Sequence, residues 1–546
     1  MPVPTTTKLR LTGHVVTMDA ACKQVPNGVI YIDGTNIVAV QDAKAPPPDG
    51  FASVPAVDTG GIIFPGLIEL HNHLSYNTLR TWRVPAKFAN RGQWPRHPEY
   101  SQLVTGPMGV LGRSTDPSVL AALVRYVEAK CLVAGVTTSQ GIALASNAGI
   151  RHYYKGIVRN VESPDDPAFP KAGSHIPDLA ASEWKKFDNE LVKAKAKASC
   201  MLLHLSEGID QSARNHFLAL ESGDTWAINS ALAGIHCAAL EAPDFEIMAQ
   251  HGGSMVWSPL SNYLLYGDTA KVHLALEHKV PVALGSDWSP TGSKNLLGEL
   301  KVAKLANDQL GTKLSDADIV ALVTRNAAAI VKWDKWLGSI EPGKRADLTV
   351  VAGKVSDPHG SLIRARERDV LAVLIRGTPR YGDQKLMKAL GATGESLIVG
   401  GQAKLADFND PLGDPDVDKI PLADAISILK DVLARIPNLE THERLGRGAL
   451  HRPLAASAPP RARLLLEEPE GEQPDHRTRH AFFGAGVASP VAAPAGASLA
   501  AKLPLIPLQL DALTVDDDPD FRTMLGQQQN LPAWLSQGLQ SVLSQN

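Results

Sequence analysis

The sequence predicts an α/β fold close to a (β/α)8 barrel, and three observations support this expectation. Between about residues 61 and 335, short β runs alternate with helical stretches, which is typical of parallel α/β folds. The number of β runs and the length of this region both approach those of a (β/α)8 barrel. Before and after this region the pattern is β alone, and a C-terminal extension follows. The expected units are therefore 1–60 (β), 61–335 (barrel), 336–400 (β) and 401–546 (extension, partly an extended arm).

The elements follow from hydrophobic periodicity. In the first unit, residues 9–18 and 28–40 alternate apolar and polar side chains, and Asp33-Gly34 marks a turn. Residues 61–70 are almost continuously apolar, as expected of a strand buried on both faces. Residues 117–134 exemplify the helices. The expected barrel strands are 61–70, 136–138, 156–160, 200–203, 233–235, 254–257 and 281–284.

The extension contains three kinds of sequence. Residues 422–436 carry apolar side chains at helical spacing and predict an amphipathic helix. Residues 453–507 are rich in proline and alanine, which favours a linker or an arm laid over the surface. The acidic segment 515–521 lacks the glycine and distal glutamate of a calcium loop, so we interpret it as a solvated turn.

Bulk composition excludes several classes of function. The 546 residues are 44% apolar and 20% charged, with a net charge of −3. This near-neutral balance disfavours nucleic acid and anionic membranes as partners. The four cysteines are too few and scattered for a disulfide framework or a CxxC metal site. Because no signal peptide and no apolar run of about 20 residues is evident, we expect a cytoplasmic protein.

Two histidines follow the apolar run 61–70. Because a strand alternates its side chains between two faces, His71 and His73 point the same way. Two imidazoles on one face can hold a metal, or they can be polar residues that end a strand. An HxH motif alone does not decide between these readings.

Further candidate ligands end other predicted strands. His204 ends one strand with Glu207 three residues later, His236 ends another, and Asp287 follows a third. A single strand-end histidine is usually hydrogen-bonded core, and a single aspartate is often a helix cap. In a barrel, however, the carboxyl ends of all strands meet at one mouth. The joint occurrence of these residues at strand ends, together with the two histidines of the HxH motif, therefore favours one functional site.

The chemistry of this set suits a catalytic metal. Imidazole nitrogens and a carboxylate bind Zn²⁺ or Fe²⁺ without thiolates. A bound divalent metal lowers the pKa of a coordinated water to about 7. Glu207 can then transfer that water's proton to the substrate. His236 can serve as a ligand or can polarise the substrate.

Several motifs together resemble the amidohydrolase superfamily, and most closely its cytosine deaminase, guanine deaminase and triazine hydrolase branch. The motifs are PGxxxxHxH (65–73), HxxE (204–207), GIHC (234–237), SPLSN (258–262) and GSDW (285–288). The stretch GSIEPGKRADLTVV resembles the return strand that completes a small β-sandwich begun by the N-terminal segment. The resemblance covers about residues 5–400.

The resemblance also implies roles for individual residues. One divalent metal, Zn²⁺ in preference to Fe²⁺, is expected on His71, His73, His204 and Asp287. Glu207 is expected to shuttle protons, Asp287 to take a proton from the metal-bound water, and His236 to contact the hydroxide or the substrate. The chain departs from the family before Ser261-Asn262: the deaminases often carry His-Cys/Asn-Pro there, and this chain has Trp257-Ser258-Pro259. Lys155 precedes its strand and is not assigned as a ligand, and Glu162 is interpreted as a surface residue.

A loop that follows the HxH strand should overhang the barrel mouth. Residues 74–98, here called the lid, contain no aspartate or glutamate. They are rich in aromatic side chains (Tyr76, Trp82, Phe88 and Trp94) and in basic ones (Arg80, Arg83, Lys87, Arg91 and Arg96). Such a loop suits a planar or anionic substrate, but it is equally typical of an interface or a packed surface loop. The expected substrate-binding residues are Trp94, His236, Trp257, Asn262 and Trp288.

The function that these residues predict is hydrolysis of a carbon–nitrogen bond by metal-activated hydroxide. Deamination of an amino-substituted nitrogen heterocycle is the leading hypothesis. Hydrolysis of a cyclic or linear amide, such as an imidazolone, hydantoin-like or N-acyl substrate, is the alternative, because the ligand motifs do not separate the two reactions. A catalytically silent scaffold would lack ligands or the proton shuttle, and this sequence has both. We expect a small-molecule substrate and a homo-oligomer.

Overall fold

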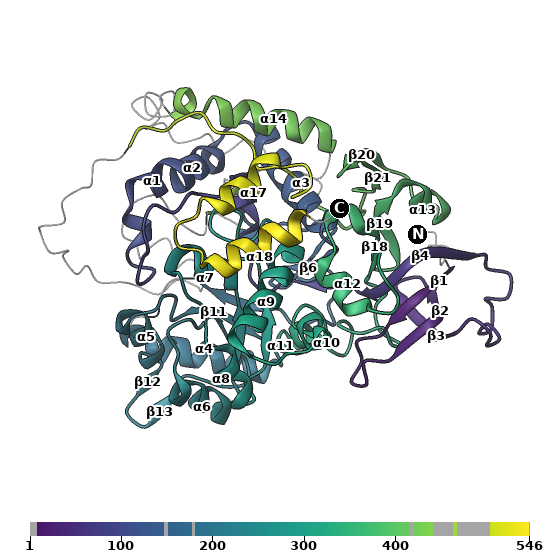
Figure 1. Cartoon of the computed structure of the whole chain (residues 1–546), viewed down its shortest axis with the longest axis horizontal. Coiled ribbons are helices and arrows are strands. Elements are labelled where there is room, and N and C mark those ends of the chain that lie inside the picture. Colours follow the sequence, from purple (N-terminus) through teal and green to yellow (C-terminus); the bar gives the residue numbers. More distant parts are fainter. Residues whose placement is uncertain are drawn as a thin grey trace, which may run out of the picture.

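Two parallel sheets form the centre of the computed structural model, which describes residues 8–146, 151–176, 179, 181–414, 420–440, 462–466 and 503–544 (Figure 1). Their strand orders are β5-β6-β9 and β10-β11-β14-β15-β16. The strands are β5 (Leu67–Ile68), β6 (Val136–Ser139), β9 (Arg159–Asn160), β10 (Gly173–His175), β11 (Met201–Leu205), β14 (Leu232–His236), β15 (Ser254–Trp257) and β16 (Val282–Leu284). Parallel strands alternating with helices confirm the predicted α/β class.

Hydrogen bonds connect the two sheets at both ends of this strand order. The amide of Ala172, before β10, donates to the carbonyl of Val161, after β9, at 2.8 Å. At the other end, the amide of Asp287 donates to the carbonyl of His71 at 2.9 Å, and that of His73 donates to the carbonyl of Asp287 at 2.8 Å. The residues that follow β5 and β16 are therefore held side by side.

Helices connect the parallel strands, and local sequence fixes where they begin. The helix α3 starts with Pro117 after Asp116, whose carboxylate accepts from the amide of Ser118. The helix α7 starts with Pro259 and ends at Gly267, which has a left-handed φ of 67°. The helices of this region are α3 (Pro117–Val133), α4 (Trp184–Ala196), α5 (Gln211–Leu218), α6 (Ala242–His251), α7 (Pro259–Tyr266), α8 (Val272–Glu277), α9 (Leu296–Leu310), α10 (Asp316–Ala321) and α11 (Arg325–Ile330).

A nine-stranded sheet combines the N-terminal strands with strands that follow the parallel sheets. Its order is β20-β21-β19-β18-β17-β4-β1-β2-β3, and the antiparallel pair β17–β4 joins the two groups. The strands are β1 (Lys8–Val16), β2 (Gln24–Asp33), β3 (Asn36–Asp42), β4 (Ala56–Pro65), β17 (Leu348–Val351), β18 (Val370–Ile375), β19 (Thr378–Asp383), β20 (Glu395–Val399) and β21 (Gln402–Ala406). Segments more than 300 residues apart thus share one sheet.

The apolar run 61–70 differs from its prediction as one strand. Residues up to Pro65 belong to β4 in the nine-stranded sheet, and only Leu67 and Ile68 belong to a parallel sheet. Gly66 lies between them, where a side chain would collide with Thr137. The run is apolar throughout because both sheets bury it, so its composition does not reveal the change of sheet.

The C-terminal extension returns to the centre of the molecule. The predicted amphipathic helix is present as α14 (Leu422–Ala434), which packs against α3. The final helices, α17 (Pro519–Gly526) and α18 (Ala533–Ser544), appear in yellow in Figure 1, and α18 packs against α9. Most of the proline-rich stretch 453–507 lies outside the described residues. Within the described part of the chain, no helix is both long and apolar enough to span a membrane.

The acidic segment of the extension is only partly the solvated turn that we expected, because Asp517 and Asp520 are exposed but Asp518 is not. Asp518 is buried, and its carboxylate lies 2.9 Å from the ammonium group of Lys294. Just before the segment, Asp511 is fully buried between Lys130 and Lys294, at 2.5 and 2.6 Å. These partners lie hundreds of residues away, so the acidic composition alone suggested solvent.

Candidate active site

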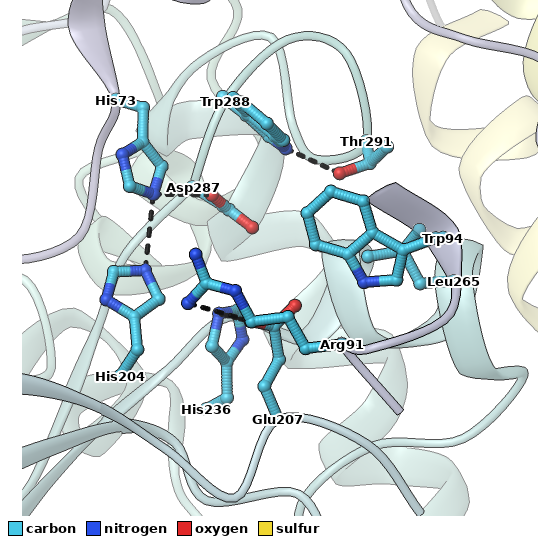
Figure 2. A pocket seen from close by; sticks show the side chains of 10 residues that line it. All are labelled: His73, Arg91, Trp94, His204, Glu207, His236, Leu265, Asp287, Trp288 and Thr291. Atoms are coloured by element: carbon cyan, nitrogen blue, oxygen red, sulfur yellow. Dashed lines mark hydrogen bonds and ion pairs between the residues drawn. The ribbon is translucent and has the colours of Figure 1, made fainter. Parts of the chain in front are cut away.

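Six predicted site residues from four chain segments meet at the carboxyl ends of the parallel strands. His204 is the second-to-last residue of β11, and His236 is the last residue of β14. The remaining four residues follow strands: His71, His73, Glu207 and Asp287. All six are buried, with exposures of 5% or less. Figure 2 shows His73, His204, His236, Glu207 and Asp287 converging on one pocket. The structure therefore brings together the six side chains that the sequence offered as site candidates.

The distances between donor atoms match those of a metal coordination shell. The Nε2 atom of His204 lies 3.2 Å from Nε2 of both His71 and His73. The Oδ1 atom of Asp287 lies 3.4 Å from Nε2 of His71 and 3.5 Å from Nε2 of His73. Ligands about 2.1 Å from a tetrahedral metal are separated by about 3.4 Å. Potential metal-binding groups include His71, His73 and Asp287, and also His71, His204 and His236.

Burial keeps the ligand imidazoles ready to bind a cation. It lowers the pKa of His71 and His204 well below the usual range, and nearby cationic groups lower both further. These rings are therefore neutral at pH 7 and carry a lone pair for a metal. Burial also raises the pKa of the Asp287 carboxyl. A divalent cation would counter that effect by favouring the carboxylate.

The backbone at two site residues occupies the left-handed region. His236 has a φ of 68° and Asp287 a φ of 65°, which non-glycine residues adopt infrequently. The glycine of GSDW permits this arrangement, because a Cβ atom on Gly285 would lie 2.5 Å from Cβ of His71. The strained turns thus direct both side chains into the pocket.

A second set of contacts comes from one short segment, Ser258 with helix α7. The hydroxyl of Ser258 lies 2.7 Å from Nδ1 of His71, and that of Ser261 donates to Asp287 at 2.6 Å. The amide of Asn262 lies 3.0 Å from Nδ1 of His236. Such contacts orient metal-binding imidazoles and carboxylates. The SPLSN motif therefore holds His71, Asp287 and His236 in their orientations.

The last residue of α7 connects the lid to Glu207. The Tyr266 hydroxyl donates to Oε1 of Glu207 at 2.8 Å and accepts from the indole of Trp94 at 2.9 Å. The hydroxyl is buried, and burial together with the Glu207 charge raises its pKa well above the usual range. It therefore stays protonated and holds the carboxylate in place.

We expect the Tyr266→Phe variant to lower kcat by about 3- to 30-fold, because one hydrogen bond to a charged group is lost. The metal content should not change, since Tyr266 belongs to neither potential metal-binding group. Steady-state kinetics with metal analysis checks this. Tyr263→Phe is the matched control, because it removes from the same helix a hydroxyl that makes no hydrogen bond within the described part of the chain. Equal kcat values in both variants would contradict the role.

The substrate-binding predictions separate into two groups. Trp94, His236 and Trp288 line the pocket, together with Arg91, Leu265 and Thr291. Trp257 and Asn262 are buried but are not among the lining residues of this pocket. The indole of Trp257 donates to Thr269 instead, at 2.8 Å. Trp257 ends β15, but its strand-end position did not reveal which way its side chain points. Asn262 lies within α7, not at the strand end where we expected it.

The lid is mostly packed structure. Tyr76, Trp82 and Phe88 are buried in the main hydrophobic core, and of the predicted lid aromatics Trp94 alone lines the described pocket. Arg91 also lines the pocket, although the sequence does not distinguish it from the other basic lid residues. Leu265 and Thr291 were missed, although they lie next to the SPLSN and GSDW motifs.

Glu162 is not the surface residue that we expected. It is 7% exposed, and its carboxylate accepts from the amide of Gly141 at 3.0 Å and from Gln140 at 3.3 Å. It belongs to neither potential metal-binding group. Lys155 is exposed, in agreement with leaving it unassigned.

Comparison with known proteins extends these observations. Residues 193–380, which include His204, His236 and Asp287, match the model of the amidohydrolase family. The chain contains an amidohydrolase family domain. The resemblance inferred from the motifs is thereby confirmed. The site geometry described above lies within and around this amidohydrolase domain.

Named relatives of this chain include deaminases. A 5-methylthioadenosine/S-adenosylhomocysteine deaminase of Thermoanaerobacter pseudethanolicus is 27% identical over 385 residues, 64% of this chain and 88% of the relative. An imidazolonepropionase of Shouchella clausii is 26% identical over 332 residues, 54% of this chain and 71% of the relative. An adenosine deaminase from Xanthomonas campestris with bound zinc superposes with a TM-score of 0.56 at 18% identity, covering 79% and 98% of the two chains. The structural match indicates a shared fold.

Proposed function

We propose that this amidohydrolase is a metal-dependent hydrolase of carbon–nitrogen bonds that deaminates an amino-substituted nitrogen heterocycle. The observation that carries the proposal is the spacing of 3.2–3.5 Å among the donor atoms of His71, His73, His204 and Asp287, with Glu207 in the same pocket. The deaminase relatives support the reaction class.

The donor set fits one divalent metal. His71, His73, His204 and Asp287 would hold it, and three imidazoles with one carboxylate favour Zn²⁺, with Fe²⁺ as the alternative. The zinc-bound adenosine deaminase supports this choice. When bound, such a metal supplies a nucleophilic hydroxide at neutral pH.

The chain's own residues handle protons and orientation. Glu207 is the proton shuttle, because its carboxylate lies in the pocket and Tyr266 fixes its position. His236 faces the same space, with its Nε2 atom 3.6 Å from Oε2 of Glu207, and is suited to polarise the substrate. Asp287 is a second acceptor for the proton of the attacking water.

The pocket walls suit a planar substrate. Trp94 and Trp288 line one side with their ring centroids 6.2 Å apart. Leu265 adds an apolar contact. Aromatic faces stack on planar rings, so a small heterocycle fits these walls. Trp94, Trp288 and His236 are the proposed substrate contacts.

Amide hydrolysis is the second candidate. The imidazolonepropionase relative favours it, because the same donor set and shuttle can open an amide ring. In that reaction Glu207 would pass its proton to a ring nitrogen that stays attached to the product.

The architecture belongs to the same proposal. We infer that the eight parallel strands close into a (β/α)8 barrel and that the nine-stranded sheet forms the small β-sandwich. The hydrogen bonds from Ala172 to Val161 and from Asp287 to His71 support closure. The homo-oligomer and the cytoplasmic location stay predictions from the sequence.

Ammonia release tests the proposed function. The metal-loaded protein is incubated with a panel of amino-substituted heterocycles and with cyclic and acyl amides, while loss of each substrate is followed in parallel. Ammonia from an aminated ring is the expected result. Amide loss without ammonia would instead support the second candidate, and no turnover of either class would contradict both.

A further inference from the structure

Five cations of the lid have different surroundings. Arg83, Lys87 and Arg96 are exposed, and Arg80 pairs with Asp518 and Asp520 of the extension at 3.2 Å. Arg91 differs from these, because it is 8% exposed and lines the pocket. Figure 2 shows its guanidinium between His204 and Glu207, in front of His236. Among the lid cations, Arg91 is therefore the one placed to meet a substrate.

The structure fixes Arg91 through its backbone. Its amide donates to the carbonyl of Glu207 at 3.0 Å, and the preceding Asn90 pairs with Gly208 in an antiparallel bridge. Gly208 has a φ of 143°, and a Cβ atom there would lie 2.5 Å from the carbonyl oxygen of Ala89. The lid is thus attached to the segment that carries the proposed proton shuttle.

The side chain of Arg91 is also held. Its Nη1 atom donates to the carbonyl of Ile176 at 2.7 Å and lies 3.6 Å from Oε2 of Glu207. A guanidinium presents five N–H donors in a rigid, planar fork that matches a carboxylate. A guanidinium held in advance loses less freedom when a ligand binds. Arg91 is therefore a preorganised anion-binding group beside the proposed reaction centre.

The charges of the pocket favour one negative charge on the substrate. Arg91, Glu207 and Asp287 are its charged lining side chains, and together they sum to −1 with the imidazoles neutral. The divalent metal that His71, His73, His204 and Asp287 would hold changes this sum to +1. A monoanionic ligand balances that charge, whereas a phosphate monoester carries about −1.5 to −2.

We propose that Arg91 binds a carboxylate of the substrate. The preferred substrate is then a small planar heterocycle with one carboxylate near the carbon of the carbon–nitrogen bond that is hydrolysed. The inference rests on the proposed function for the reaction itself. Proximity follows from the 3.6 Å between Arg91 and Glu207. The walls formed by Trp94 and Trp288 favour a planar ring.

Binding of two isosteric probes tests the proposal without turnover. Benzoate and benzamide differ in charge but hardly in shape, and quenching of tryptophan fluorescence reports binding next to Trp94 and Trp288. Metal-loaded wild type should bind benzoate more tightly than benzamide. In Arg91→Gln the Kd of benzoate should rise about 10- to 100-fold, while that of benzamide stays within about twofold. Arg83→Gln, which removes an exposed cation of the same loop, should behave as wild type.

A second variant covers the case in which Arg91→Gln does not fold. Arg91→Lys keeps the charge but loses the fork, so its benzoate affinity should fall between those of wild type and Arg91→Gln. Unchanged benzoate binding in both variants would overturn the proposal, because the carboxylate would then be held elsewhere. An equal loss for benzoate and benzamide would also overturn it, since Arg91 would then only shape the pocket.

Kinetics separates this inference from the proposed function. For a carboxylated aminoheterocycle and its carboxamide, Arg91→Gln should raise KM for the carboxylate alone, with kcat nearly unchanged. A similar fall of kcat for both compounds would assign Arg91 to positioning Glu207 and overturn the carboxylate contact. Arg91-dependent benzoate binding without ammonia release from any heterocycle would support the anion site and contradict deamination.

Discussion

The Glu207→Gln variant should retain its metal and lose about 10³-fold or more of its turnover, because a general acid–base group contributes about 10²–10⁴-fold. Glutamine has the same size and can still accept the hydrogen bond from Tyr266. It cannot carry a proton between the attacking water and the leaving nitrogen. Glu207 belongs to neither potential metal-binding group, so metal occupancy should not change.

Two measurements on the same sample check this result: metal analysis and ammonia release. Glu246→Gln is the matched control, because it makes the same chemical change on an exposed position of α6. It should keep wild-type activity. Full activity in Glu207→Gln would contradict the shuttle, and loss of the metal would show that Glu207 acts as a ligand.

The Asp511→Ala variant should lower the free energy of unfolding by about 3–5 kcal/mol, the cost of leaving a buried charge without its partner. Asp511 is fully buried and pairs with the ammonium groups of both Lys130 and Lys294. Lys130 also donates to the carbonyl of Asn77, so the loss should disturb the start of the lid. Denaturant titration followed by fluorescence measures the change.

A control and a pH series sharpen this experiment. Asp520→Ala removes an aspartate side chain that is 72% exposed, and its pair with Arg80 should contribute no more than about 1 kcal/mol. Burial lowers the pKa of Lys130 to about 8. Lys130 is therefore mostly neutral at pH 9, and the effect of Asp511→Ala should be smaller there than at pH 7. An equal loss of unfolding free energy in Asp511→Ala and Asp520→Ala would contradict the importance of the buried network.

Local pattern identified the metal-binding candidates because each lies at a strand end. The apolar strands ending at His71, His204 and His236 are visible in the sequence, and a parallel sheet brings their ends together. The direction in which a strand-end side chain points was harder to predict. Trp257 also ends a strand, yet its indole bonds to Thr269, because packing around the strand decides which way its side chain turns.

Long-range pairing explains the features that the sequence did not predict. The change of sheet at Gly66 depends on the partner strand β17, almost 300 residues away. The burial of Asp518 depends on Lys294, and the selection of Arg91 among five lid cations depends on Gly208 and Ile176. None of these partners leaves a local periodic signal.

The contacts between the lid and the C-terminal extension have a consequence for synthesis of the protein. Gln528 exchanges hydrogen bonds with the backbone of Trp82 and Val84, and Asn530 donates to the carbonyl of Ala86. A ribosome makes the chain from its N-terminus, so the lid must wait for more than 400 further residues before these contacts can form. A nascent chain that already carries every proposed catalytic residue therefore still lacks these contacts, and we expect full activity to arise only after Gln528 and Asn530 have been made.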